Sequence, residues 1–334
     1  MQKIPIGING FGRIGRTLLR QSLKRENIQV VAINDIAPIE TMKHLLQYDS
    51  IHGVLHEEVL VENNFLVIGN QRIKYTQWQH PEDISWEDVE VVIESTGKFK
   101  TMESANFHLK NDVKKVIISA PASDEKIPTV VLGVNERKLT HEHHIISNAS
   151  CTTNNAAPML QLIQDNCQIE SAYITTVHSY TTDQSLHDQP HADLRRARGA
   201  AQSIVPTTTG AAKALTKIFP ELDQKIGGSG IRVPVPNGSL TDITCYVKHP
   251  KSPEEINQLF AEAAKNQLNG ILAYTNDPIV SVDVIGNPNS CLFDASLTSV
   301  IGNMVKIVGW YDNETGYSNR LLDLIAYLKV NQYI

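Results

Sequence analysis

One cysteine, Cys151, stands in a polar segment that could carry nucleophilic chemistry. Residues 147–154 read Ser-Asn-Ala-Ser-Cys-Thr-Thr-Asn, and the hydrophobic pattern predicts a strand before this segment and a helix after it. A cysteine at a helix N-terminus experiences the positive end of the helix dipole, which stabilises the thiolate. Isolated cysteines are usually small buried hydrophobic residues, but hydroxyl neighbours on both sides are not typical of core packing. We therefore expect Cys151 to be a nucleophile.

His178 is the candidate base. It closes a strand expected at 171–178 and begins the segment His-Ser-Tyr-Thr-Thr-Asp. A histidine can take up and release a proton near neutral pH, and at a strand end it can reach a nucleophile on another element. A structural histidine is the alternative, and it is the better interpretation for most of the twelve histidines. The spacing of Cys151 and His178 does not by itself pair them.

Near the N-terminus, Gly10, Gly12 and Gly15 form a Gly-x-Gly-x-x-Gly segment between an expected strand and an expected helix. Glycines let backbone N–H groups approach a pyrophosphate, and the helix N-terminus favours its negative charge. Asp35 ends the next expected strand, 20 residues after Gly15. A carboxylate there can accept the ribose hydroxyls of NAD and repels a 2′-phosphate. The pattern predicts an NAD site rather than a glycine turn without a ligand.

The elements that must position these residues change in character along the chain. In the first part, short apolar strands alternate with helices such as 14–24, which predicts a parallel, doubly wound sheet. These strands are expected at 4–8, 29–33, 90–94 and 115–119. Later strands are longer, and fewer helices separate them, which favours an antiparallel sheet. They are expected at 171–178, 231–248, 271–284, 292–300 and 304–310, with helices at 152–166, 210–219 and 253–268.

Two domains are therefore expected. An α/β Rossmann dinucleotide-binding domain covers residues 1–148, and an α+β catalytic domain with a mixed, largely antiparallel sheet covers 149–314. A last apolar helix, from about residue 317 to 330, could pack back on the first domain, so that 315–334 completes it.

Length and composition are those of a globular enzyme. The chain has 334 residues, a formal net charge of -6 and four cysteines without a Cys-x-x-Cys pair. A mildly acidic protein is a poor candidate for nonspecific binding to nucleic acid or anionic membranes. No signal peptide or membrane-spanning run is recognised, so a reducing, cytoplasmic compartment is expected. The adjacent histidines of 141–144 are interpreted as a solvated loop, and no metal site is expected.

Several longer motifs resemble the phosphorylating glyceraldehyde-3-phosphate dehydrogenases, and the similarity runs from Ile6 to the C-terminus. The motifs are residues 147–154, 178–181, 188–198, 206–213, 232–234 and 310–317. The resemblance implies that Cys151 and His178 act together, with the thiolate attacking an aldehyde and the histidine accepting the hydroxyl proton. It also implies hydride transfer to NAD, a thioester on Cys151, and release of an acyl phosphate by inorganic phosphate.

The resemblance implies further site residues. The phosphate of glyceraldehyde 3-phosphate would be bound by Thr181, Arg196 and Arg232, with Asp183 orienting Arg196. The attacking phosphate would be bound by Ser150, Thr152, Thr209 and Gly210. The cofactor site would be completed by Arg13, Ile14, Thr96, Ser119 and Asn313, the last at the nicotinamide amide. A homotetramer is implied as well.

Four positions depart from the commonest form of the family. Gln79 stands where an arginine near the adenosine is usual, and Asn155 replaces a frequent second cysteine. Gln189 and Gly238 replace a leucine and a valine. None of these changes removes a catalytic group, but Gln79 and Gln189 leave the adenosine contacts open.

Two other functions remain open from the sequence. Erythrose-4-phosphate dehydrogenases share the scaffold and the nucleophile, but the 207–213 motif favours the phosphate-using enzyme. An RNA-binding or surface-adhesion protein of this fold would not need the full set of catalytic residues, which this chain retains. The arginines at 195, 196 and 198 could form a nucleic-acid patch, but the net charge and the lack of interleaved aromatic residues argue against it.

Overall fold

The computed structural model describes residues 3–334 and divides into two compact units. The first unit comprises the chain up to Val130, together with Glu136–Ala149 and Ser318–Ile334. The second comprises Val131–Asn135 and Ser150–Tyr317. The sequence placed the change of domain between residues 148 and 149, and the units change between Ala149 and Ser150.

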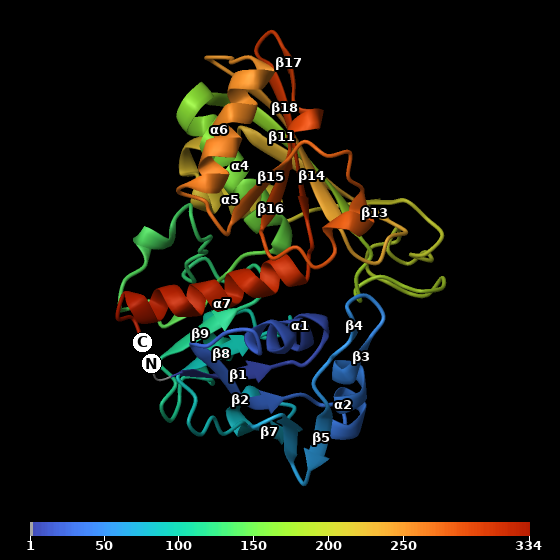
Figure 1. Cartoon of the computed structure of the whole chain (residues 1–334), viewed down its shortest axis with the longest axis vertical. Helices are drawn as coiled ribbons and strands as arrows, with labels where there is room; N and C mark the ends of the chain where they lie inside the picture. Colours follow the sequence, from blue (N-terminus) through green and yellow to red (C-terminus); the bar gives the residue numbers. More distant parts are fainter. Residues whose placement is uncertain (1–2) are drawn as a thin grey trace. The chain divides into compact units, whose positions relative to one another are not determined.

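The first unit is built on an eight-stranded sheet in the order β10-β9-β8-β1-β2-β7-β6-β5 (Figure 1). Neighbours from β10 to β7 pair in parallel, whereas β7, β6 and β5 form an antiparallel meander. The parallel part consists of β1 (Ile4–Asn9), β2 (Ile28–Asn34), β7 (Gln71–Thr76), β8 (Val91–Glu94), β9 (Lys115–Ile118) and β10 (Ile145–Ser147). The meander adds β5 (Val59–Glu62) and β6 (Phe65–Ile68), and a hairpin joins β3 (Tyr48–Asp49) and β4 (Gly53–Val54).

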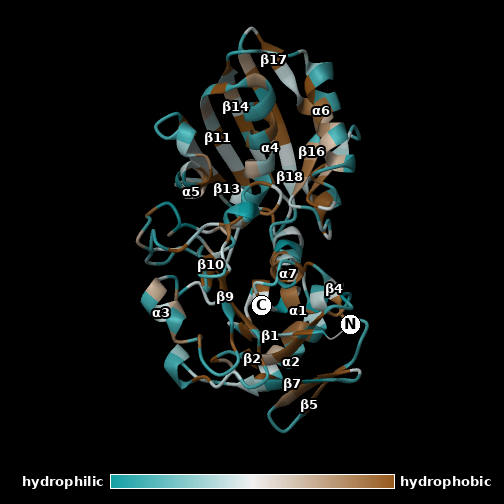
Figure 2. Ribbon diagram, turned by 90° about the vertical axis from the view of Figure 1, so that its left-hand side faces the viewer, coloured by the Kyte–Doolittle hydropathy of each residue, from teal (hydrophilic) through white to brown (hydrophobic). Residues whose placement is uncertain are grey.

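Burial explains why the parallel strands could be predicted. Strands β8 and β9 are buried along their whole length, because a parallel sheet is covered on both faces. Figure 2 shows the hydrophobic residues of this core in brown. The helices of this unit are α1 (Arg13–Ser22), α2 (Ile39–Gln47) and the short α3 (Met102–Asn106). The predicted strands and the predicted helix at 14–24 are confirmed, and the meander, which is mostly half-exposed, was missed.

The C-terminal helix α7 (Thr315–Val330) is tied to the first unit by ion pairs. Arg25 pairs with Asp323 at 2.9 Å, and Glu90 pairs with Lys329 at 3.1 Å. Its apolar residues Leu321, Leu322, Leu324, Ile325 and Leu328 are buried. The helix therefore contributes to the core of the first unit although it is distant in sequence.

The second unit contains a mixed sheet in the order β12-β13-β11-β14-β18-β16-β15, with β17 paired to β18. Most neighbours are antiparallel, but β11 pairs in parallel with β13, as does β15 with β16. The strands are β11 (Ile169–Ser179), β12 (Val205–Thr207), β13 (Ile226–Val233), β14 (Ser239–Val247), β15 (Leu272–Thr275), β16 (Cys291–Asp294), β17 (Ser299–Ile301) and β18 (Met304–Tyr311). The helices α4 (Cys151–Cys167), α5 (Ala211–Ile218) and α6 (Pro253–Lys265) pack against it.

Three long strand predictions in this unit were wrong. The segment 231–248 is two strands, because the chain turns at Gly238, which has φ +84°. A Cβ at Gly238 would lie 2.1 Å from the carbonyl oxygen of Ser281, so the valine usual in the family does not fit this backbone. The segments 271–284 and 292–300 each contain a strand followed by a 3₁₀ turn, at Ser281–Val284 and Ala295–Leu297. A hydrophobic pattern does not show where such a turn interrupts a strand.

Candidate active site

Cys151 is the first residue of helix α4, as the sequence predicted. Ser150 precedes it as the N-cap and accepts a hydrogen bond from the backbone N–H of Thr153 at 3.1 Å. Cys151 is half-buried, whereas the other three cysteines, Cys167, Cys245 and Cys291, are buried in helix α4 and in strands β14 and β16. The prediction that those three are packing residues is confirmed by their burial, and Cys151 is the cysteine that a substrate can reach.

His178 lies beside Cys151, which the spacing in the sequence could not establish. The distance between Cys151 Sγ and His178 Nε2 is 3.5 Å. His178 sits near the end of β11, and the parallel register of the sheet places Arg232 of β13 opposite it. Helix α4 and the sheet therefore bring a thiol, an imidazole and a guanidinium together.

A carbonyl oxygen and a guanidinium both contact Nδ1 of His178. Its Nδ1 lies 2.7 Å from the carbonyl oxygen of Ser179, and Arg232 donates to the same oxygen at 3.0 Å. The Arg232 guanidinium also lies 2.5 Å from Nδ1. A proton on Nδ1 that is donated to Ser179 leaves Nε2 as a lone-pair acceptor toward Cys151. The Arg232 guanidinium can only donate, so its contact with Nδ1 favours the other tautomer, and a base at Nε2 requires the Ser179 contact to hold the proton on Nδ1.

Burial and the Arg232 charge set the protonation states of the pair. Burial, as the larger cause, and the positive charge of Arg232 together lower the pKa of His178 to about 3. Burial also raises the pKa of the Cys151 thiol, although Arg232 and hydrogen bonds from Thr152 oppose this rise. Burial therefore opposes the stabilised thiolate that the sequence predicts at this helix N-terminus. The pair is a thiol facing a neutral imidazole, which is the arrangement for general-base activation.

Tyr311 is a site residue that was not assigned from the sequence. Its hydroxyl lies 2.9 Å from the hydroxyl oxygens of both Thr152 and Thr176, and its ring meets the His178 ring edge-on at 5.9 Å. Burial raises its pKa, so the phenol stays protonated. The residue lies within the 310–317 motif, but nothing in that motif distinguished it from a core tyrosine. The Thr152 hydroxyl, expected at the attacking phosphate, is buried and engaged with Tyr311.

The residues expected at the substrate phosphate form a connected group. The Arg196 guanidinium pairs with the Asp183 carboxylate, which also accepts from the Thr181 hydroxyl, and Arg196 Nε donates to Thr207 at 3.0 Å. Burial tends to raise the pKa of Asp183, but the Thr181 hydrogen bond and the charges of Arg232 and Arg196 lower it overall. The group thus presents two arginines within electrostatic reach of one carboxylate.

Thr209 and Gly210 lie at the start of helix α5. The Thr209 hydroxyl accepts from the backbone N–H of Ala211 at 3.2 Å, and Gly210 is the N-cap. A Cβ added at Gly210 would meet no atom within 4 Å, so the space in front of it is open. An exposed helix N-terminus of this kind favours an anion.

The first unit has a cavity of about 280 Å³ at the carboxyl ends of its parallel strands. It is lined by Asn9, Gly10, Gly12, Asn34, Asp35, Ile36, Trp78, Gln79, Ser95, Thr96, Lys98 and Phe99. The predicted residues Gly10, Gly12, Asp35 and Thr96 are among them. The other predicted residues Arg13, Ile14 and Ser119 are not in this lining.

The sequence contains a signal for three further residues of this cavity lining. Asn9 and Asn34 end β1 and β2, and Ser95 follows β8, so all three lie where the carboxyl ends of parallel strands meet. The Arg13 side chain forms a bidentate ion pair with Asp49, with N–O distances of 2.7 and 3.2 Å.

This cavity has the chemistry that a dinucleotide requires. Helix α1 has no side-chain cap at Gly12, and a Cβ at that glycine would meet nothing within 4 Å. A Cβ at Gly15 would lie 2.3 Å from the Gly10 carbonyl oxygen, so only glycine permits the close turn. The Asp35 carboxylate accepts from the backbone N–H of Phe11 at 2.6 Å and of Ala37 at 2.9 Å, which holds it at the cavity. Backbone donors and a fixed carboxylate fit a pyrophosphate and a ribose.

Asn313 is held in one orientation in the second unit. Its Oδ1 accepts from the hydroxyls of Ser179 at 2.9 Å and Ser239 at 3.0 Å. Ser239 Oγ itself accepts from the Ser179 backbone N–H at 3.1 Å, so its own proton is directed to Asn313. The amide NH₂ of Asn313 is therefore the group left to donate to a ligand.

The histidines of 141–144 make other contacts. His143 Nδ1 accepts from the Thr140 backbone N–H at 3.0 Å, and the His141 ring lies 4.9 Å from the Tyr333 ring. Within residues 3–334, no group of three His, Cys, Asp or Glu side chains is placed to hold a metal ion. In the same part of the chain, no helix is both long and apolar enough to cross a membrane.

Comparison with known proteins identifies the family of the chain. Residues 4–102 match the NAD binding domain of glyceraldehyde 3-phosphate dehydrogenase, and residues 150–313 match its C-terminal domain. The glyceraldehyde-3-phosphate dehydrogenases of Priestia megaterium and Geobacillus stearothermophilus are each 50% identical over 329 residues, and that of Mycobacterium avium is 51% identical over 332 residues. Each similarity covers 97% of this chain and 98% of the relative. The chain belongs to the glyceraldehyde-3-phosphate dehydrogenase family.

Proposed function

We propose that the chain is an NAD-dependent, phosphorylating glyceraldehyde-3-phosphate dehydrogenase, which converts glyceraldehyde 3-phosphate and inorganic phosphate to 1,3-bisphosphoglycerate. The observation that carries the proposal is the 3.5 Å contact between Cys151 Sγ and His178 Nε2, with Arg232 beside the histidine. The family match over nearly the whole chain supports it.

The chemistry follows from the pair. Cys151 sulfur bonds to the aldehyde carbon, and the thiol proton passes to the new hydroxyl oxygen. His178 Nε2 then accepts the hydroxyl proton as this carbon is oxidised. NAD, when bound, takes up the hydride from that carbon. A thioester remains on Cys151, and an oxygen of inorganic phosphate attacks its carbonyl carbon, which breaks the C–S bond. The acyl phosphate leaves, and a proton returns to the sulfur.

Two anion sites serve the two phosphates in this proposal. Arg196 and Arg232, with Thr181 and Asp183, bind the substrate's phosphate, because guanidinium groups form charge-assisted forks to it. The open N-terminus of helix α5 at Thr209 and Gly210, with Ser150 and Thr152, receives inorganic phosphate. The backbone N–H of Cys151 stabilises the oxyanion. Gly10, Gly12, Arg13, Ile14, Asp35, Thr96 and Ser119 form the NAD site, and Asn313 donates to the nicotinamide amide.

A homotetramer is part of the proposal. Tyr173 and Tyr246, on the neighbouring strands β11 and β14, are 53% and 52% exposed, and Ile301 of β17 is 67% exposed. Exposed apolar residues on one sheet support burial against a second copy of the chain. Sedimentation should give about four times the chain mass of 37.1 kDa. The four free cysteines support a reducing compartment, the cytoplasm.

Turnover assays test the activity. The enzyme should oxidise glyceraldehyde 3-phosphate rapidly with NAD, and omission of phosphate should reduce steady turnover to the slow hydrolysis of the thioester. Turnover that does not depend on phosphate, with erythrose 4-phosphate as the better substrate, would instead identify the erythrose-4-phosphate enzyme.

A further inference from the structure

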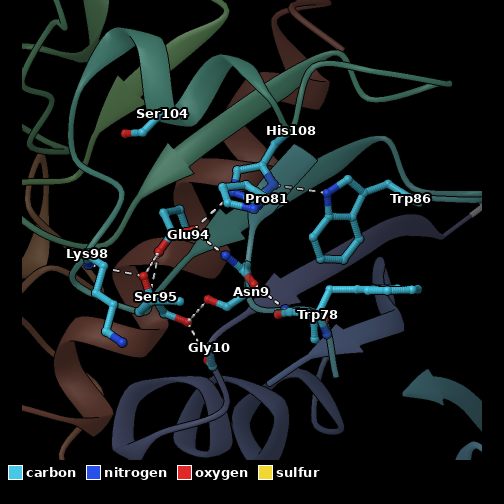
Figure 3. Close-up of polar contacts among 12 residues, drawn as sticks. Asn9, Gly10, Trp78, Pro81, Trp86, Glu94, Ser95, Lys98, Ser104 and His108 are labelled. Carbon is cyan, nitrogen blue, oxygen red and sulfur yellow. Dashed lines mark hydrogen bonds and ion pairs between the residues drawn. The ribbon is translucent and has the colours of Figure 1, made fainter. Parts of the chain in front are cut away.

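A buried carboxylate, Glu94, lies at the carboxyl end of β8 behind the dinucleotide cavity. Its side chain is fully buried, and its oxygens accept four hydrogen bonds (Figure 3). Asn9 Nδ2 donates at 2.6 Å and His108 Nε2 at 3.1 Å to one oxygen, while the backbone N–H and hydroxyl of Thr96 donate to the other. A buried carboxylate is costly unless its acceptor sites are filled, and here they are filled.

The proton positions around Glu94 are determined by its neighbours. The Trp86 indole N–H can only donate, and it donates to His108 Nδ1 at 3.1 Å. His108 Nδ1 therefore carries no proton, and Nε2–H is the donor to Glu94. The Thr96 hydroxyl accepts from the backbone N–H of Lys98 at 3.1 Å, so its proton is directed to Glu94. All four groups around the carboxylate are therefore donors.

From Glu94, two amides form a directional relay to the cavity. Asn9 donates to Glu94 and accepts through Oδ1 from Asn34 Nδ2 at 2.9 Å. Asn34 Oδ1 then accepts from the backbone N–H of Trp78 at 2.9 Å and from the Thr76 hydroxyl at 2.8 Å, while Asn34 Nδ2 also donates to the Trp78 carbonyl. The relay begins at a group that can only accept and ends at a backbone N–H that can only donate. Neither amide can turn over without placing two like groups together.

Both ends of this network reach the cavity wall. Asn9, Asn34, Trp78 and Thr96 all line the cavity, and Trp78 leads directly into Gln79. We propose that Glu94 is a positioning residue for the dinucleotide, which holds the Trp78–Gln79 segment through the Asn9–Asn34 relay and the opposite wall through Thr96. This inference rests on the proposed NAD-dependent function. The charge of Glu94, and not only its shape, is required. Each carboxylate oxygen accepts from two donors, so the amide NH₂ of a glutamine would face two donors in either orientation.

Direct binding of NAD to Glu94→Gln, measured by titration calorimetry, tests the role. We expect the Kd for NAD to rise about tenfold, which corresponds to about 1.4 kcal/mol. ADP-ribose, which lacks the nicotinamide, should lose the same factor, because the relay acts on the adenosine and pyrophosphate end. In turnover, the loss should appear in the KM for NAD rather than in kcat.

The control is Lys115→Met, which removes another buried charge from the same unit. Lys115 Nζ donates to the carbonyl oxygens of His141 and His143, both at 2.9 Å, and lines no part of the cavity. The Lys115→Met variant should have a lower melting temperature but an unchanged Kd for NAD. Wild-type affinity in Glu94→Gln, or an equal loss in Lys115→Met, would overturn the positioning role.

A milder variant keeps the test decisive if Glu94→Gln does not fold. Thr76→Val removes the hydroxyl donor to Asn34 at the far end of the relay and should weaken NAD binding about threefold. An unchanged Kd there would contradict the proposal. Failure of the wild type to bind NAD would instead refute the proposed function, so the two failures are distinguishable.

Discussion

Replacement of Arg232 by glutamine should separate recognition of the substrate phosphate from the acid–base chemistry. The guanidinium lies 2.5 Å from His178 Nδ1 and donates to Ser179 at 3.0 Å. Glutamine can retain a hydrogen bond to Ser179 but carries no charge. The change therefore removes a proposed phosphate ligand and also a cation beside the proposed base.

The size of each effect follows from these contacts. A charge-assisted hydrogen bond to phosphate contributes about 1.5–3 kcal/mol, so kcat/KM for glyceraldehyde 3-phosphate should fall about 10- to 150-fold. Arg232 also lowers the pKa of His178, and its removal should raise that pKa. Burial is the larger cause and persists, so the pKa should remain below its ordinary value. The acid limb of the pH–rate profile should therefore move upward and remain below pH 6.5.

The assay compares kcat/KM for phosphorylated and unphosphorylated glyceraldehyde across pH. The loss should be much smaller for the unphosphorylated aldehyde, because it has no phosphate to lose. Arg198→Gln is the matched control, since Arg198 forms an exposed ion pair with Asp188 at 2.9 Å and should leave both substrates unaffected. An equal penalty for both aldehydes in Arg232→Gln would show that the arginine has a structural role only.

The remaining predictions concern the nucleophile, the cofactor and acid stability. Cys151→Ser should abolish oxidation while calorimetry still detects NAD binding; substantial residual activity would exclude it as the nucleophile. The wild type should strongly prefer NAD to NADP in kcat/KM, and Asp35→Gly should reduce the ratio; equal efficiency in the wild type would contradict this. The pKa of His178 in the folded state is lowered to about 3, so the free energy of unfolding should fall as the pH decreases below 6.5. The slope should be at most about 1.4 kcal/mol per pH unit. In urea titrations, His178→Asn should flatten this slope. Peroxide should inactivate the enzyme without an intrachain disulfide at Cys151, because Asn155 stands one turn away and the other cysteines are buried; a cross-linked peptide in non-reducing mass spectrometry would refute this.

The parallel strands of the first unit could be predicted because continuous apolar runs and the glycine segment report burial and turn chemistry directly. The meander from β5 to β7 could not, since its half-exposed strands lack a strong pattern. In the second unit, the turn at Gly238 and two 3₁₀ turns interrupt segments that look like single strands. Those interruptions are set by tertiary contacts, such as the approach of Ser281 to Gly238, that no local window contains.

The site shows the same division between local and long-range information. Cys151 at a helix start and Asp35 at a strand end are local features, and the sequence contained enough to propose both. The Cys151–His178 contact depends on how helix α4 meets the end of β11, so only family resemblance supplied it beforehand. Tyr311 and the Asn9–Asn34 relay were missed, because hydrogen-bond partners up to 159 residues apart leave no periodic signal.

The electrostatics of the pair indicate how the substrate activates its own base. Burial raises the pKa of the Cys151 thiol and lowers that of His178, so proton transfer in the empty site would separate charge where solvation is poor. Arg232 favours the thiolate but opposes a charged imidazole. A phosphate bound to Arg232 offsets that positive charge and removes the opposition to protonation of His178. Formation of the carbon–sulfur bond then removes any need for a lasting thiolate. In the proposed mechanism, recognition of the phosphate and activation of the base are therefore coupled through one guanidinium, and an unphosphorylated aldehyde should both bind more weakly and meet a weaker base.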